Sequence, residues 1–246
     1  MAKPRDTALL NTDPSAQKGK GIAFFVLGLV ACIVLMQFSF GQKRLYPFHI
    51  LSTWFHEMGH GLTAKVLGGE FHQLELMASG AGLATHSGVA LGRLGRALVA
   101  AGGLLGPSIA AAILICFGRS RRGSSITLWV LGLVLLGSLL VVRGGFGIVF
   151  VIVVGLAVLG MAWKGSPPFK WAGVQILAAN AVLGTWRDLD YMFSPGGVIN
   201  GVAFNSDSQN IAEALTLGLL PYWFWGGVIA LLSFLIIFAA LRRAYK

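Results

Sequence analysis

Charged side chains are scarce in this sequence. Asp, Glu, Lys and Arg make up 11% of its 246 residues, whereas a soluble domain carries about 25%. Hydrophobic residues reach 56%, and the mean hydropathy is +0.76. Such a chain cannot cover a water-facing surface, so a soluble enzyme is excluded and a multi-pass integral membrane protein is predicted.

Acidic residues are scarcer than basic ones, nine against 19, which gives a formal net charge of +10. Most of the cations stand between apolar stretches, where positive charge sets topology and contacts anionic lipid. We therefore expect the lipid bilayer as a partner and no nucleic acid. The strongest cytoplasmic signals are Arg119, Arg121 and Arg122 and the terminal group Arg242, Arg243 and Lys246.

The cysteines, Cys32 and Cys116, number only two, and both lie inside apolar runs. Two thiols in that setting are typical of small packing residues and do not indicate a secreted, disulfide-stapled fold.

The chain divides into a disordered polar tail, residues 1–20, and a single domain, residues 21–246. Apolar runs of spanning length predict an all-α polytopic membrane protein with six to seven transmembrane helices. Alternating Leu74, Glu75 and Leu76 before Gly80 predict a small β-hairpin within 70–89. A polar loop is expected over 194–214. The expected helices cover 21–40, 47–67, 93–117, 126–142, 146–163, 169–187 and 219–241.

The sequence His56-Glu57-Met58-Gly59-His60 is an HExxH motif. On a helix, residues four apart share one face, so both imidazoles can reach one metal ion. Two nitrogen ligands and a carboxylate favour Zn²⁺, with the fourth position left to water. Glu57 is the candidate base for that water, at an apparent membrane depth where a carboxylate needs a functional reason.

A third protein ligand is needed, and few residues can supply it. Asp188 and Asp190 are the leading candidates, because both stand at the end of an apolar helix, where an acid most needs a reason. Because successive spans alternate in direction, the end of the expected helix 169–187 and the end of the motif helix 47–67 should lie at the same face of the membrane. His49 is expected at the membrane interface, and the hairpin residues His72, His86, Glu70 and Glu75 are more often solvated. Asp207 and Glu213 complete the candidates, of which Asp207 and His86 come next after the two acids of the apolar helix.

These features together resemble the site-2 protease family of intramembrane zinc metalloproteases, and within it the M50B-like branch. The resemblance rests on HEMGH in an apolar helix, the hairpin, the segment AGGLLGP at 101–107 and a later membrane Asp. It implies a polytopic helical fold and peptide-bond hydrolysis within the bilayer. It also implies that His56, His60 and a later Asp bind zinc and that Glu57 is the base.

The later family motif places an Asn eight residues before its Asp, as Asn180 stands before Asp188. The resemblance therefore implies Asp188 as the third ligand, with Asp190 in reserve. Two departures accompany this match: Arg187 replaces an apolar residue, and no Gly follows Asp188. Leu189-Asp190 matches the Leu-Asp dipeptide of the family motif, but at a shifted position. The segment 205–207, Asn-Ser-Asp, resembles a polar element of the M50B-like branch, and an Asx turn or helix cap is the expected structure there.

The leading functional hypothesis is an intramembrane metalloprotease that acts on a membrane protein or peptide. The short chain and the family likeness place it in a bacterial cell membrane. The alternative is a catalytically inactive scaffold, a pseudoprotease, that retains a metal site. Metal or proton transport is disfavoured, because residues 126–142 and 146–163 contain no ionisable side chain along a path.

Overall fold

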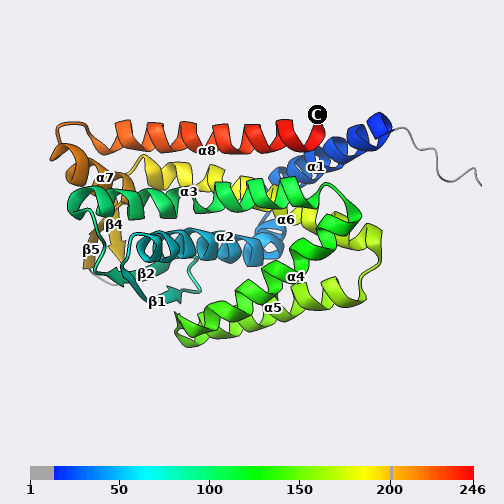
Figure 1. Cartoon of the computed structure of the whole chain (residues 1–246), viewed down its shortest axis with the longest axis horizontal. Helices are drawn as coiled ribbons and strands as arrows, with labels where there is room; N and C mark the ends of the chain where they lie inside the picture. The colour runs from blue at the N-terminus through cyan, green and yellow to red at the C-terminus, as the bar shows by residue number, and fades with distance from the viewer. Residues whose placement is uncertain (1–13, 200–201) are drawn as a thin grey trace, which may run out of the picture.

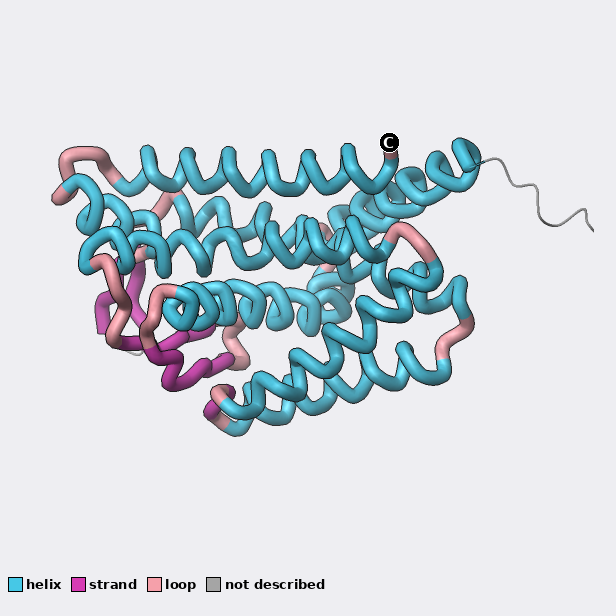
Figure 2. The backbone as a smooth tube through the Cα atoms, in the orientation of Figure 1, coloured by secondary structure: helices cyan, strands magenta, loops and turns pink. Residues whose placement is uncertain are grey.

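The computed structural model describes residues 14–199 and 202–246 (Figure 1). Strands form two small sheets beside a helical bundle (Figure 2). The strands are β1 Glu70–Leu76, β2 Gly82–Ser87, β3 Val142–Arg143, β4 Gly196–Ile199 and β5 Val202–Asn205. The helices are α1 Pro14–Met36, α2 Ser39–Val66, α3 Gly92–Gly118, α4 Arg121–Gly137, α5 Gly145–Lys164, α6 Pro167–Met192, α7 Asp207–Thr216 and α8 Tyr222–Tyr245, with a 3-10 turn at Ser138–Leu140.

Four helices of the described part are long and apolar enough to cross a membrane: α3, α4 with its 3-10 extension, α5 and α8. The chain is thus a mostly helical integral membrane protein, as the composition predicts. The expected six to seven spans exceed this number, because α2 and α6 carry the polar residues of the site and α1 has only a short apolar part, Ile22–Met36.

Helix α3 lies at the centre of the bundle and packs against α2, α6, α7 and α8 (Figure 1). Its contact with α2 depends on glycine. A Cβ at Gly102 would collide with Thr63, and one at Gly106 would collide with the Phe55 carbonyl. Small residues let the two backbones approach closely, as in other membrane helix pairs. The motif helix is thereby fixed against the most central helix.

The predicted hairpin is confirmed, and it lies along the motif helix. Strands β1 and β2 pair antiparallel, and β3 joins β1 in parallel, so the order is β2-β1-β3. The turn is tied to α2 by Thr53 Oγ1, which donates to the Gly80 carbonyl at 2.8 Å, and by Tyr46, whose hydroxyl donates to the Ala78 carbonyl at 2.7 Å. Among the described residues, the outer edge of β2 has no partner strand.

Three expected boundaries differ from the structure. The predicted loop at 194–214 is wrong, because this stretch forms the β4–β5 hairpin and most of α7. Helix α2 begins at Ser39, so Pro47 lies inside it and not in its first turn. Helix α1 begins at Pro14, and the part of the expected tail before it, residues 1–13, lies outside the described residues.

Candidate metal centre

The two motif histidines meet on one face of α2, as their spacing predicts. His56 Nε2 and His60 Nε2 are 3.1 Å apart. The side chains are only 11% and 12% exposed, so two imidazoles converge at a nearly buried point.

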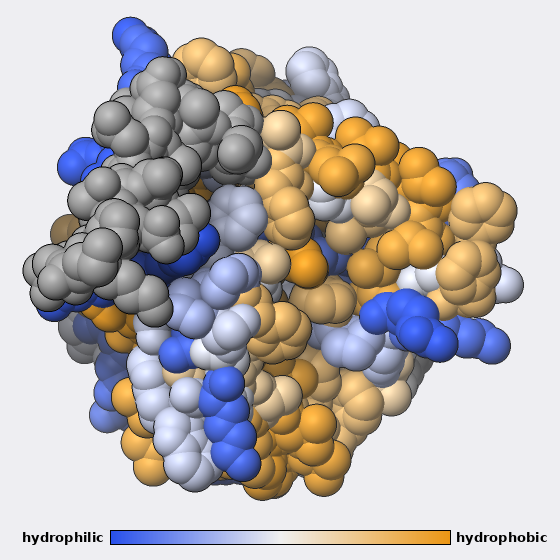
Figure 3. Space-filling view, turned by 90° about the vertical axis from the view of Figure 1, so that its right-hand side faces the viewer, coloured by the Kyte–Doolittle hydropathy of each residue, from blue (hydrophilic) through white to orange (hydrophobic). Residues whose placement is uncertain are grey.

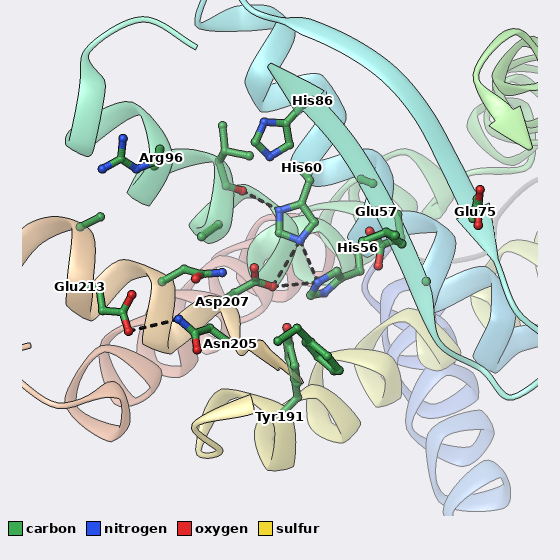
Figure 4. A pocket seen from close by; sticks show the side chains of 18 of the residues that line it. His56, Glu57, His60, Glu75, His86, Arg96, Tyr191, Asn205, Asp207 and Glu213 are labelled. Carbon is green, nitrogen blue, oxygen red and sulfur yellow. Dashed lines mark hydrogen bonds and ion pairs between the residues drawn. The ribbon is translucent and has the colours of Figure 1, made fainter. Parts of the chain in front are cut away.

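The third group at this point is Asp207, the first residue of α7. Its Oδ2 lies 3.1 Å from His56 Nε2 and 3.2 Å from His60 Nε2 (Figure 4). Ser206 caps the helix: its hydroxyl accepts from the Gln209 N–H at 3.2 Å and donates to the Ser194 carbonyl at 2.6 Å. The expected helix cap at 205–207 is therefore present, and it fixes the start of α7 so that the Asp207 carboxylate faces the histidines.

The charge of Asp207 is stabilised by this arrangement. Burial alone would raise the pKa of the carboxyl, but the facing imidazoles of His60 and His56 hold that pKa well below its ordinary value. Asp207 therefore presents an ionised oxygen to the cluster.

The donor set fits a zinc ion. Tetrahedral bonds of about 2.0–2.1 Å place neighbouring ligand atoms about 3.3–3.4 Å apart, and the three distances here are 3.1, 3.1 and 3.2 Å. Within the described residues, His56, His60 and Asp207 are the group of His, Cys, Asp or Glu side chains close enough together to hold a metal ion. Two imidazoles and one carboxylate leave a fourth tetrahedral position for water.

The outer nitrogens of both histidines also have partners. His60 Nδ1 lies 2.9 Å from the Val99 carbonyl. Because a carbonyl only accepts, Nδ1 carries the proton and Nε2 keeps its lone pair for a metal. His56 Nδ1 faces Asp188 Oδ2 at 3.6 Å. Such outer partners orient metal-bound histidines and raise their basicity.

The predicted ligand Asp188 thus lies beside the cluster and not in it. Its carboxylate faces the nitrogen of His56 that points away from Asp207 and His60. Its neighbour in reserve, Asp190, is exposed. The alternation of helix directions correctly predicted that the end of α6 lies near the HExxH motif. It could not predict which nitrogen of His56 the Asp188 carboxylate would face.

The candidate base Glu57 is buried, at 6% exposure, and lines the same cavity as the histidines. Its carboxylate is hydrogen-bonded to the backbone of Ala84 in β2. Gly82 allows this close contact, because a Cβ there would lie 2.6 Å from both Cγ and Oε1 of Glu57. The hairpin therefore holds the motif glutamate in place.

The cavity has a volume of about 1180 Å³ and opens between β2, β5, α7 and the start of α3 (Figure 4). His86 of β2 lines it, as do Glu75, Glu213 and two arginines, Arg93 and Arg96. His72 lies outside its lining and bonds Ser87 Oγ at 2.6 Å. An extended peptide could reach the histidine cluster through this opening.

The comparison with known families agrees with this geometry. The family described as Peptidase M50B-like matches residues 26–240, which include every helix from α2 to α7, the second half of α1 and most of α8. No curated protein and no solved structure matches the chain.

Proposed function

The chain belongs to the Peptidase M50B-like family, and we propose that it is an intramembrane zinc metalloprotease that hydrolyses a peptide bond of a membrane-embedded substrate. The observation that carries this proposal is the triangle of His56 Nε2, His60 Nε2 and Asp207 Oδ2 at the base of a cavity that also contains Glu57. The location in a bacterial cell membrane stays a prediction.

We propose His56, His60 and Asp207 as the three protein ligands. Asp188 is then the acid that orients His56 through Nδ1, the role that the Val99 carbonyl has for His60. This assignment replaces Asp188 by Asp207 as the third ligand, because only Asp207 lies on the side of both Nε2 atoms.

Zinc bound there would supply a water with a pKa of about 7 and polarise the scissile carbonyl. Glu57 is the group placed to take a proton from that water and to pass it to the leaving amine. Its burial supports this role, since a proton that the carboxylate has taken up is shielded from bulk water until it passes to the leaving amine. The hairpin contact at Ala84 keeps it aimed at the cavity.

The substrate must be extended when it is cut, because a helical backbone shields its own carbonyls. Strand β2 lines the cavity through Leu83, Ala84 and His86, and no strand of the described part of the chain pairs with its outer edge. A substrate segment that adds to this edge would be held straight beside the histidines.

Helices α2 and α6 complete the embedded bundle in this proposal. They have 28 and 26 residues, more than the about 20 needed to span. Polar groups in the middle of both helices face inward: Glu57 of α2 is 6% exposed, and Gln175 and Asn180 of α6 are 1% and 2% exposed. Low hydropathy in these helices thus reflects in part buried polar side chains.

The test combines metal analysis with a cleavage assay. The purified wild type is compared with Glu57→Gln for zinc content and for hydrolysis of transmembrane peptides. One zinc per chain in both proteins, with cleavage only in the wild type, supports the protease. Zinc in both with cleavage in neither favours the inactive scaffold.

A further inference from the structure

Basic residues gather at one end of the four candidate spans. Eight cations flank the end of α3, the start of α4, the end of α5, the start of α6 and the end of α8, and no acid lies among them in the sequence. These eight are Arg119, Arg121, Arg122, Lys164, Lys170, Arg242, Arg243 and Lys246. Figure 1 shows these helix ends on its right-hand side, and Figure 3 looks onto that end, where hydrophilic side chains border an apolar face.

The opposite ends of the same spans have few cations. The start of α3 carries Arg93 and Arg96, the α4–α5 connection carries Arg143, the last parts of α2 and α6 carry Lys65 and Arg187, and the segment directly before α8 carries none. Eight basic residues against five is a bias toward the first end under the positive-inside rule, which counts Lys and Arg near span ends. The end with eight is therefore the cytoplasmic one.

The metal centre belongs to the other end. Val99, which binds His60, is seven residues after Gly92, the first residue of α3. At 1.5 Å per residue, the site lies about 10 Å along a helix of about 40 Å. The hairpins and α7, which border the cavity, lie at this same end (Figure 1).

From this arrangement we propose that the cavity opens on the non-cytoplasmic side of the membrane and takes the non-cytoplasmic flank of its substrate's transmembrane segment. The orientation depends only on the charge bias and the fold, while the choice of substrate segment rests on the function proposed above. The products are then released on the side away from the cytoplasm.

The charges of the cavity fit such a segment. Arg93 and Arg96 are exposed at its rim, and among the described residues neither forms an ion pair or a hydrogen bond. The positive-inside rule that orients this protein also depletes Lys and Arg from the non-cytoplasmic flanks of its substrates. A flank that contains an acidic side chain and no cation is therefore the complementary partner.

The experiment labels single cysteines in intact bacterial spheroplasts with a bulky membrane-impermeant maleimide. The background carries Cys32→Ser and Cys116→Ser, and zinc content verifies its fold. Ala203→Cys probes the cavity lining, and Ser166→Cys, at the exposed start of α6, probes the basic end. A permeant maleimide on lysed cells shows that both cysteines can react.

Ala203→Cys is expected to react before lysis and Ser166→Cys only after it. The reverse pattern overturns the orientation, and this result needs no enzymatic activity. The labelled proteins are then purified and assayed. Loss of peptide cleavage in labelled Ala203→Cys, but not in labelled Ser166→Cys, supports substrate entry through this opening, whereas full cleavage in both overturns it.

Discussion

Replacing Asp207 by Asn should remove most of the affinity for zinc. The change keeps the shape of the side chain but takes the charge from an oxygen that lies 3.1 and 3.2 Å from the two imidazole nitrogens. Zinc sites with four protein ligands bind with about 10–16 kcal/mol, so one ligand accounts for about 2.5–4 kcal/mol. At about 1.4 kcal/mol per tenfold, the dissociation constant should rise about 10²–10³-fold.

The same change at Asp188 should act more weakly. Asp188 faces His56 Nδ1 at 3.6 Å, and loss of such an outer partner costs about 10–100-fold in affinity. Asp190→Asn, at an exposed position of the same helix, is the matched control and should leave affinity unchanged.

Affinity is measured by competition with a coloured zinc chelator on detergent-purified variants of equal thermal stability. The order of weakening should be Asp207→Asn first, Asp188→Asn second and Asp190→Asn least. If Asp188→Asn loses more affinity than Asp207→Asn, the ligand assignment is refuted and the acid of α6 is the third ligand.

Three further changes probe the base, the packing and the rim of the site. Glu57→Gln should retain zinc and lower the rate of peptide cleavage by about 10²–10⁴-fold, the usual contribution of a general base; equal zinc loss would contradict that role. Gly103→Ala should weaken zinc binding and cost about 1–3 kcal/mol of stability, because its Cβ would collide with the His60 ring. Gly137→Ala, which has open space around it, should change neither the affinity nor the melting temperature. Arg96→Glu should slow cleavage of peptides with an acidic flank about two- to fivefold and favour basic ones; an unchanged preference would argue against the rim charge.

Local parts of this site could be predicted from the sequence because they depend on one element. His56 and His60 share a helix, and a spacing of four residues places them together whatever the rest of the fold does. The hairpin was equally readable, since Leu74, Glu75 and Leu76 alternate before a glycine turn. Both signals act over a few residues.

The third member of the cluster could not be predicted in this way because its position depends on distant packing. Asp207 is 151 residues from His56 in sequence, and the β4–β5 hairpin and the start of α7 bring it there. The polar segment before α8 looked like a loop, since its strands have four residues each. One local signal was present: a Ser before an Asp is a typical helix start, where the cap fixes the direction of the next side chain.

The balance of buried charge gives a physical reason for a cation at this centre. Glu57 and Asp207 are 6% and 7% exposed, and Asp188 approaches the far side of His56. Arg187, the sequence neighbour of Asp188, is directed to the Met36 sulfur and does not enter the cluster. Several carboxylates beside two imidazoles, away from water, repel one another unless positive charge lies among them. A divalent ion held by His56, His60 and Asp207 supplies that charge where the oxygens converge, so the same ligand set would both stabilise the end of the bundle and create the reaction centre.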